Sequence, residues 1–289
     1  ARHPAQRSQM ESTLHAALLG LIQALTEFLP VSSSGHLKLG HAWLGFDATN
    51  DLAFDLILHA GTLVAVFAVY SKRILGLLRG VAAGVADLPS GLRSALERHE
   101  GLRYLLLIIV ATIPTGIIGL LLDDWVETGI TSPRVVGGLL LINGLMLFQS
   151  RRFTGDDQRD RGPLSVGGIG VREALIIGVM QGVAVLPGIS RAGATIVTAL
   201  ALGAWRLRAA EFSFFLSIPA ILGAIVLKLD PAELAATHGA LVDYGVGAVV
   251  AAAGGIFALK VLLGLLRDAR LHSFAYYCWL LGLVAIIVG

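Results

Sequence analysis

This chain is poor in cysteine and in charge, and both shortages limit what it can be. Cys278 is the single cysteine among 289 residues, which excludes a disulfide framework and a metal site built from several thiolates. Only 15% of the residues are charged, against about 25% in an ordinary soluble domain. The net charge of +2 provides no strongly basic surface, so we expect no nucleic-acid partner.

Apolar residues take the place of the missing charge. They make up 55% of the chain, Gly contributes 35 more residues, and the mean hydropathy is +0.77. A transmembrane helix needs roughly 20 residues, and apolar runs of about that length recur, the two shortest with their flanks included. We predict an all-α polytopic membrane protein with six full transmembrane helices. The predicted spans are Leu52–Tyr70, Tyr104–Leu122, Val135–Phe148, Phe212–Leu229, Leu241–Leu266 and Phe274–Val288.

Basic residues are concentrated in alternate loops. The segments 71–103, 149–172 and 267–270 are rich in Arg and Lys, whereas 123–134 holds one Arg and 230–240 holds neither. The positive-inside rule therefore places the first three segments in the cytoplasm and the other two outside. With six spans, both termini then lie outside.

Two further apolar segments, 14–44 and 171–202, are each broken in the middle by Pro and Gly. The runs 29-LPVSSSG-35 and 186-LPGISRAG-193 share one pattern, and 54-FDLILHAGT-62 and 212-FSFFLSIPA-220 follow at matching offsets. The chain is therefore predicted to be one integral membrane domain, 10–289, that contains an internal duplication with halves 10–150 and 151–289. Residues 1–9 are polar, and we set them aside as a tag remnant or disordered tail.

The number of full crossings must stay at six, so each broken segment has to enter and leave the membrane on the same side. We therefore interpret each as a re-entrant helix–loop–helix. Halves separated by an odd number of spans are inverted, as in transporters whose broken helices meet near the midplane. The alternative is that both segments are kinked full spans. Polar loops at membrane depth favour re-entry, because irregular backbone is tolerated there only where protein or a wet cavity surrounds it.

The first loop carries polar groups that an apolar segment would normally exclude. Glu27 precedes the break, and an ionisable residue inside such a segment indicates a functional site by default. Ser32, Ser33, Ser34 and His36 follow within nine residues, and a hydroxyl-rich turn before a helix suits an anion such as phosphate. The plainer alternatives are an interfacial Glu and a serine that caps the next helix.

The second loop supplies the opposite charge through Arg191, flanked by Ser190 and Thr195. A guanidinium binds phosphate oxygens in a bidentate way, although Arg191 is also a natural partner for Glu27. A carboxylate can hold Mg²⁺ or Ca²⁺ against a substrate phosphate. Together these residues indicate metal-assisted phosphoryl transfer on a substrate that lies in the bilayer. Asp55 and His59, four residues apart, either face the same pocket or pack in the bundle.

The runs 23-QALTEFLPVSSSGH-36 and 187-PGISRAGAT-195 resemble the two signatures of the undecaprenyl-diphosphate phosphatase family (BacA/UppP), the bacitracin-resistance proteins. The likeness extends over nearly the whole chain from Met10. It implies a divalent-cation-dependent hydrolase that converts undecaprenyl diphosphate to the monophosphate and inorganic phosphate. This reaction recycles the lipid carrier of peptidoglycan synthesis at the outer face of the bacterial cytoplasmic membrane.

The resemblance also implies roles for individual residues. Glu27 becomes a metal ligand or base, Arg191 the diphosphate clamp, and Ser33 and His36 the candidates for nucleophile and proton transfer, with water as the other nucleophile. The remaining candidates for substrate binding are Gln23, Ser32, Ser34, Ser190 and Thr195. Gln23 stands where many members carry a second Glu, and Ala192 replaces a Ser that commonly follows the Arg. The first departure weakens a metal site with two carboxylates, and the second means that this hydroxyl is not essential here.

A lipid-phosphate flippase or secondary transporter with the same inverted-repeat fold is the alternative function, since architecture does not fix activity. A transporter needs neither a Ser and a His beside Glu27 nor a divalent cation for turnover. The expected partners are a polyprenyl diphosphate and membrane lipids. The sequence leaves a homodimer and the preferred chain length of the substrate open.

Overall fold

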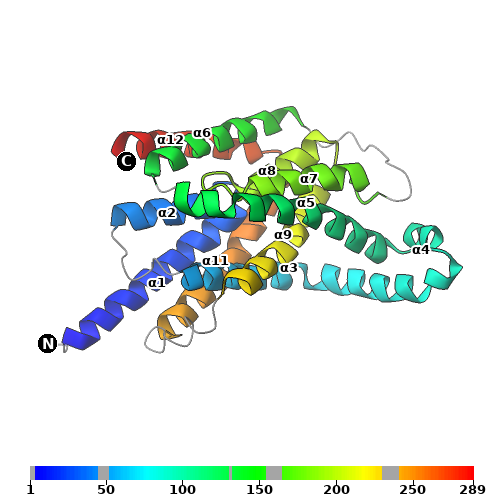
Figure 1. Ribbon diagram of the computed structural model, residues 1–289, viewed down its shortest axis with the longest axis horizontal. Helices are drawn as coiled ribbons and strands as arrows, with labels where there is room; N and C mark the ends of the chain where they lie inside the picture. Colours follow the sequence, from blue (N-terminus) through cyan, green and yellow to red (C-terminus); the bar gives the residue numbers. More distant parts are fainter. Residues whose placement is uncertain (1–3, 45–51, 130–131, 154–164, 230–240) are drawn as a thin grey trace.

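The computed structural model describes residues 4–44, 52–129, 132–153, 165–229 and 241–289, and within these ranges the chain is helical (Figure 1). Within these ranges, Val166 and Ile169 also form an isolated antiparallel β-bridge. The α-helices are α1 (Pro4–Phe28), α2 (Ser33–Leu44), α3 (Leu52–Ala86), α4 (Leu92–Arg98), α5 (Glu100–Gly129), α6 (Pro133–Gln149), α7 (Val171–Val183), α8 (Arg191–Ala201), α9 (Arg206–Lys228), α11 (Leu241–Arg267) and α12 (Phe274–Val288). Short 3₁₀ turns precede α4, follow α6 and precede α12.

Five stretches of the described chain are long and apolar enough to cross a membrane, which confirms a multi-pass helical membrane protein. They are Leu52–Ala86, Glu100–Val126, Arg206–Lys228, Leu241–Arg267 and Leu271–Val288. The sixth predicted span, 135–148, lies in α6, whose 17 residues reach about 26 Å at 1.5 Å per residue. This is somewhat less than the ~30 Å hydrocarbon core, so α6 stays a predicted crossing.

Both broken segments consist of two helices joined by a short irregular connection, as the sequence predicts. Residues 29–32 separate α1 from α2, and residues 184–190 separate α7 from α8. Helix α1 begins at Pro4, so it includes part of the segment 1–9 that we expected to be a tail, and residues 1–3 lie outside the described chain. The predicted loop 230–240 lies outside it as well.

Glycines at matching places in the two halves allow close helix crossings. A Cβ on Gly20 of α1 would stand 2.5 Å from the carbonyl oxygen of Gly247 on α11, and one on Gly178 of α7 would stand 2.1 Å from that of Ala111 on α5. These separations are far below van der Waals contact, so only glycine permits the approach. Helix α1 therefore packs on α11 in the same way that α7 packs on α5.

The remaining pair, α6 and α12, lies side by side along one edge of the bundle (Figure 1). Gly137 and Gly282 meet there reciprocally, because a Cβ on either would lie within 2.8 Å of the other's carbonyl oxygen. The largest buried cluster draws residues from most helices, including Leu147 of α6 and Cys278 of α12. In that cluster the ring of Phe28, at the end of α1, packs edge-to-face on Phe214 of α9 with centroids 5.6 Å apart. This contact fixes the residue next to Glu27.

Ion pairs join α5 and α9 near both of their ends. At the first end, Arg73 of α3 contacts Glu100 at 2.6 Å and Glu211 at 3.1 Å, and Arg208 lies 3.7 Å from Glu100. At the other end, Lys228 of α9 pairs with Asp123 of α5. The two helices are therefore held at a set spacing, which matters because they form one wall of the site.

Candidate active site

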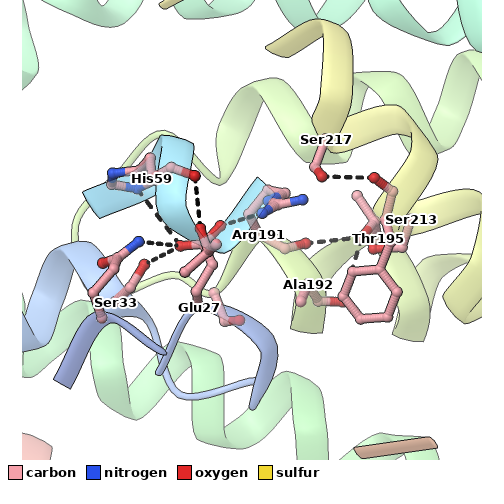
Figure 2. Close-up of polar contacts among 12 residues, drawn as sticks. Glu27, Ser33, His59, Arg191, Ala192, Thr195, Ser213 and Ser217 are labelled. Carbon is pink, nitrogen blue, oxygen red and sulfur yellow. Dashed lines mark hydrogen bonds and ion pairs between the residues drawn. The ribbon is translucent and has the colours of Figure 1, made fainter. Parts of the chain in front are cut away.

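Glu27 is the centre of a polar cluster at the end of α1, and only 7% of its surface is exposed (Figure 2). Its carboxylate accepts hydrogen bonds from Ser33 Oγ at 2.7 Å and from Gln23 Nε2 at 3.0 Å. On its other oxygen it pairs with the guanidinium of Arg191, at the start of α8. The structure thus brings together four of the predicted residues from the two broken segments. Both oxygens of this buried carboxylate therefore have donors.

His59 of α3 also belongs to this cluster, with Nε2 3.5 Å from Glu27 Oε2. Its Nδ1 lies 2.8 Å from the carbonyl oxygen of Asp55. A carbonyl can only accept, so Nδ1 donates to it, and Nε2 faces Glu27. The sequence left open whether His59 faces the pocket or packs in the bundle, and the structure shows that it faces the pocket.

The two loops are hydrogen-bonded to each other. Ser32 Oγ accepts from the backbone N–H of Gly188 at 3.0 Å and from that of Gly35 at 3.3 Å. Ser32 has φ 72°, a conformation that costs a non-glycine residue energy, and Gly188 has φ 111°, which is open to glycine alone. Backbone strain of this kind persists where the surrounding contacts impose it, and here the two loops impose it on each other.

Asn143 of α6 joins the two loops, and sequence reasoning missed it. This fully buried side chain donates to the carbonyl oxygen of Pro30 at 2.9 Å and accepts from the backbone N–H of Ser190 at 3.0 Å. It could have been found as the one amide inside the apolar run 135–148, since a polar residue at membrane depth indicates a functional position.

Ser190 and Thr195 position Arg191. Ser190 caps α8, because its Oγ accepts from the N–H of Gly193 at 3.0 Å. Thr195 Oγ1 donates to the carbonyl oxygen of Arg191 at 2.9 Å and lies 2.5 Å from Ser213 Oγ (Figure 2). The structure therefore shows contacts to the backbone around Arg191 for both hydroxyls. Their predicted contact with phosphate stays a prediction.

His36 is separated from Glu27 by its orientation. Its Nε2 lies 2.8 Å from the hydroxyl of Tyr277 on α12, with the two rings stacked at 5.7 Å, and its Nδ1 lies 2.7 Å from the carbonyl oxygen of Ser32. His36 does not line the cavity described below. Its predicted catalytic role remains a prediction, whereas Ser34 does face the cavity.

A cavity of about 700 Å³ opens beside Glu27 and Arg191. Its size falls within the ordinary range of ligand pockets. Its charged groups gather at two places, the Glu27–Arg191 cluster and the Asp123–Lys228 pair, and Gly, Ala and Leu residues of α5 and α9 line much of the wall between them. Arg191 Nη1 and Gln181 Oε1 are buried on this cavity and have no hydrogen-bond partner among the described residues. These unpaired atoms are suited to a polar ligand.

The residues around Glu27 fit a divalent cation of the kind that prefers oxygen. Beside the Glu27 carboxylate and the Ser33 hydroxyl, the amide oxygen of Gln23 is buried and has no partner in the described chain. No group of three or more His, Cys, Asp and Glu side chains gathers anywhere in the described ranges. Mg²⁺ typically uses one or two carboxylates plus substrate phosphates and water, so this sparse donor set is sufficient.

Fold and site together define a multi-pass helical membrane protein in which two broken helical segments build a buried carboxylate–guanidinium site on a cavity. The chain belongs to the family described as bacitracin resistance protein BacA, whose model matches residues 16–284.

Curated relatives agree over nearly the full chain. An undecaprenyl-diphosphatase from Methanosphaera stadtmanae is 41% identical over 97% of this chain and 99% of its own length. One from Desulfatibacillum aliphaticivorans is 42% identical over 96% and 98%, and one from Korarchaeum cryptofilum is 38% identical over 93% and 96%. The resemblance seen in the motifs therefore extends to whole proteins, and the family assignment is confirmed.

Proposed function

We propose that this protein hydrolyses undecaprenyl diphosphate to undecaprenyl phosphate and inorganic phosphate, and thereby recycles a lipid carrier for cell-wall synthesis. The observation that carries the proposal is the cluster of Glu27, Ser33 and Arg191 on a cavity inside a membrane protein. The cluster combines an activated hydroxyl, a base and an anion-binding group. The names of the full-length relatives supply the substrate.

Ser33 is the favoured nucleophile, because its hydroxyl already donates to the Glu27 carboxylate. Glu27 accepts the proton as Ser33 Oγ bonds to the terminal phosphorus, and the bond from that phosphorus to the bridging oxygen breaks. The lipid monophosphate leaves, and water then releases inorganic phosphate from the serine. A water activated by Glu27 is the alternative nucleophile, whereas His36 would first have to leave Tyr277.

Arg191 binds the phosphate oxygens as negative charge builds up on them. Without substrate its Nη2 contacts Glu27, while its buried Nη1 has no partner among the described residues. A guanidinium can use both nitrogens on phosphate, so the substrate would satisfy Nη1 as well. The Glu27 contact keeps the guanidinium in place before the substrate arrives.

A divalent cation, Mg²⁺ or Ca²⁺, would be held by Glu27, Ser33 and the amide oxygen of Gln23 together with substrate oxygens. When bound, it neutralises charge on the diphosphate. Since Gln23 replaces a second carboxylate, we expect one cation of modest affinity rather than two tightly held ions.

We also propose six spans and two re-entrant segments in an inverted repeat, with the cavity facing the outside of the cytoplasmic membrane. The matching glycine crossings of α1 on α11 and α7 on α5 support the duplication. The basic cytoplasmic segment 71–103 supports the orientation, because it puts the Asp123–Lys228 end of the cavity on the outer side.

The test is phosphate release from undecaprenyl diphosphate by purified protein, with Mg²⁺, with Ca²⁺ and with EDTA. We expect metal-dependent release that falls at least about 100-fold in Glu27→Gln, Arg191→Ala and Ser33→Ala. The control is Glu97→Gln, which breaks the exposed Arg93–Glu97 ion pair far from the cavity. It should stay within about threefold of the unmodified protein.

Absence of release from folded protein in either metal would exclude the hydrolase. The inverted-repeat alternative, a lipid-phosphate transporter, would then be tested in vesicles. Release that persists in EDTA would leave the phosphatase but remove the cation from the proposal. A homodimer also remains a prediction, and mass measurement in detergent tests it.

A further inference from the structure

Between the Glu27–Arg191 cluster and the Asp123–Lys228 pair, the wall of the cavity is formed mainly by one face each of α5 and α9. On α5 the lining residues recur every three or four positions, and on α9 they do so from Ala220 onward with Pro219 and Ile221 beside them, so each helix turns one stripe toward the cavity. The stripes are Thr112, Thr115, Gly116, Gly119, Leu120 and Asp123 on α5 and Pro219, Ala220, Ile221, Gly223, Ala224, Leu227 and Lys228 on α9. Side chains as large as the surrounding leucines are missing from the middle of both stripes.

Two glycines on these stripes border empty space. A Cβ built on Gly116 or on Gly223 meets no heavy atom within 4 Å, and one on Gly119 meets only a methyl of Val185 at 3.8 Å. This contrasts with Gly20 and Gly178, where a Cβ would collide with the backbone of a neighbouring helix. Helix packing therefore explains Gly20 and Gly178 but not Gly116 and Gly223. At the latter two positions the missing side chain leaves room in the cavity.

The opening at these glycines lies at the depth of lipid chains rather than headgroups. Gly116 is seven residues before Asp123, and Gly223 is five before Lys228, which is about 10 Å and 8 Å along the helix axes. Gly116 is itself exposed, and its neighbours on the outer surface of α5 are exposed apolar residues such as Ile113 and Ile117. The cavity thus reaches the side of the bundle among residues that face hydrocarbon.

The spacing of the two helices is set by the ion pairs near both ends. Arg208 and Glu100 approach to 3.7 Å at one end, and Lys228 pairs with Asp123 at the other. These pairs lie about 30 Å apart along α9, which is one hydrocarbon thickness. Since α5 and α9 are held at both ends, a bulky side chain between them would narrow the opening rather than push the helices apart.

We propose that the cleft between α5 and α9 binds the isoprenoid chain next to the diphosphate, and that Gly116 and Gly223 determine which chains fit. This rests on the proposed function, because the occupant is the tail of that same substrate. The diphosphate is placed at Glu27 and Arg191, and the first isoprene units run outward along the glycine stripes into lipid. The methyl branches of an isoprenoid need a wider cleft than a straight chain, which glycine on both walls provides.

The kinetic test uses Gly116→Leu and Gly223→Leu. Both positions are helical and open, so leucine should not disturb folding, which a thermal unfolding curve checks. We expect KM for farnesyl diphosphate and undecaprenyl diphosphate to rise at least about tenfold. The inhibition constant of inorganic pyrophosphate, which has the headgroup but no tail, should stay within about threefold. Gly116→Ala and Gly223→Ala should give smaller increases in KM.

Matched controls are Gly245→Leu on α11 and Gly138→Leu on α6. A Cβ at either position also meets nothing within 4 Å, but neither residue lines the cavity. Their kinetic constants should remain unchanged. Equal losses in controls and cavity variants, or an unchanged KM in Gly116→Leu and Gly223→Leu, would overturn the proposal. A parallel loss of pyrophosphate inhibition would also contradict it, because leucine would then act on the headgroup.

A second measurement separates this proposal from the proposed function, because it needs no turnover. Farnesyl diphosphate that carries a diazirine in its first isoprene unit is photolysed with the unmodified protein, and the labelled peptides are mapped. Labels within residues 112–123 and 219–228, removed by excess farnesyl diphosphate but not by phospholipid, support the tail cleft even if hydrolysis is absent. Hydrolysis with labels elsewhere, or labels that phospholipid removes, would keep the phosphatase and reject this cleft.

Discussion

The two broken segments, α1–α2 and α7–α8, share a backbone plan but carry opposite charges beside their breaks, Glu27 in the first and Arg191 in the second. With Gly35 aligned on Gly193, Glu27 falls on Val185 and Arg191 falls on Ser33. Each segment therefore holds one charge where its counterpart holds none. A buried charge without a partner is costly, so neither segment could keep its own at this depth alone. The helix–loop–helix plan is shared, whereas the chemistry is divided between the two segments.

The strongest test of this division is to remove the charge of each segment in turn. Glu27→Gln and Arg191→Gln should each lower the free energy of unfolding by about 3–5 kcal/mol, because each leaves the other charge buried and unpaired. The double variant should lose less than the sum of the two, while phosphate release stays absent in all three. Unfolding in detergent, followed as a double-mutant cycle, measures the coupling. Additive losses would show that the two charges do not stabilise each other.

A smaller effect is expected where the two segments are joined without charge. Asn143→Leu removes the hydrogen bonds to Pro30 and to Ser190, and leaves both backbone groups buried without their partner. We expect a loss of about 1–3 kcal/mol in the free energy of unfolding, together with reduced phosphate release because the loops lose their alignment.

Thr112→Val is the control for the stability effect of Asn143→Leu, since among the described residues the hydroxyl of Thr112 bonds only to the carbonyl oxygen of Ile108 within its own helix. Equal stability losses in Asn143→Leu and Thr112→Val would argue against a joining role for Asn143.

The smallest effect should come from the Asp123–Lys228 ion pair, at the end of the cavity away from Glu27. Asp123 and Lys228 are each about 30% exposed at the side chain, in contrast to the 6% of Glu27. Lys228→Met should therefore change the free energy of unfolding by less than about 1 kcal/mol, and added salt should reduce the difference further. Thermal unfolding at low and high salt checks both statements. A loss comparable to that of Arg191→Gln would mean that burial does not explain the difference between the pairs.

Much of this protein follows from local sequence. The long apolar runs predict the spans because a helix must cover the hydrocarbon thickness, and the broken segments stand out because Pro, Gly and polar residues interrupt them. Glu27 and Arg191 are conspicuous for the same reason. The case of α6 shows the limit, because its apolar run predicts a span while its 17 helical residues leave it at the short end of the range.

Rotation of each helix about its own axis was not predictable. A helix that is apolar on all sides carries no periodic signal of which face turns inward. For that reason the sequence could not tell that His59 faces Glu27 while His36 faces Tyr277, or that Asn143 reaches both loops. Nor could it separate Gly20, which permits a helix crossing, from Gly116, which leaves a cavity open.

By itself, the sequence determined the membrane setting, the two broken segments and the residue types of the site, because hydropathy and local breaks are properties of short segments. Only the tertiary structure decided which side chains meet. Helices distant along the chain must cross before a carboxylate from one half can lie against a guanidinium from the other. Those crossings depend on the packing of the whole bundle rather than on any one segment.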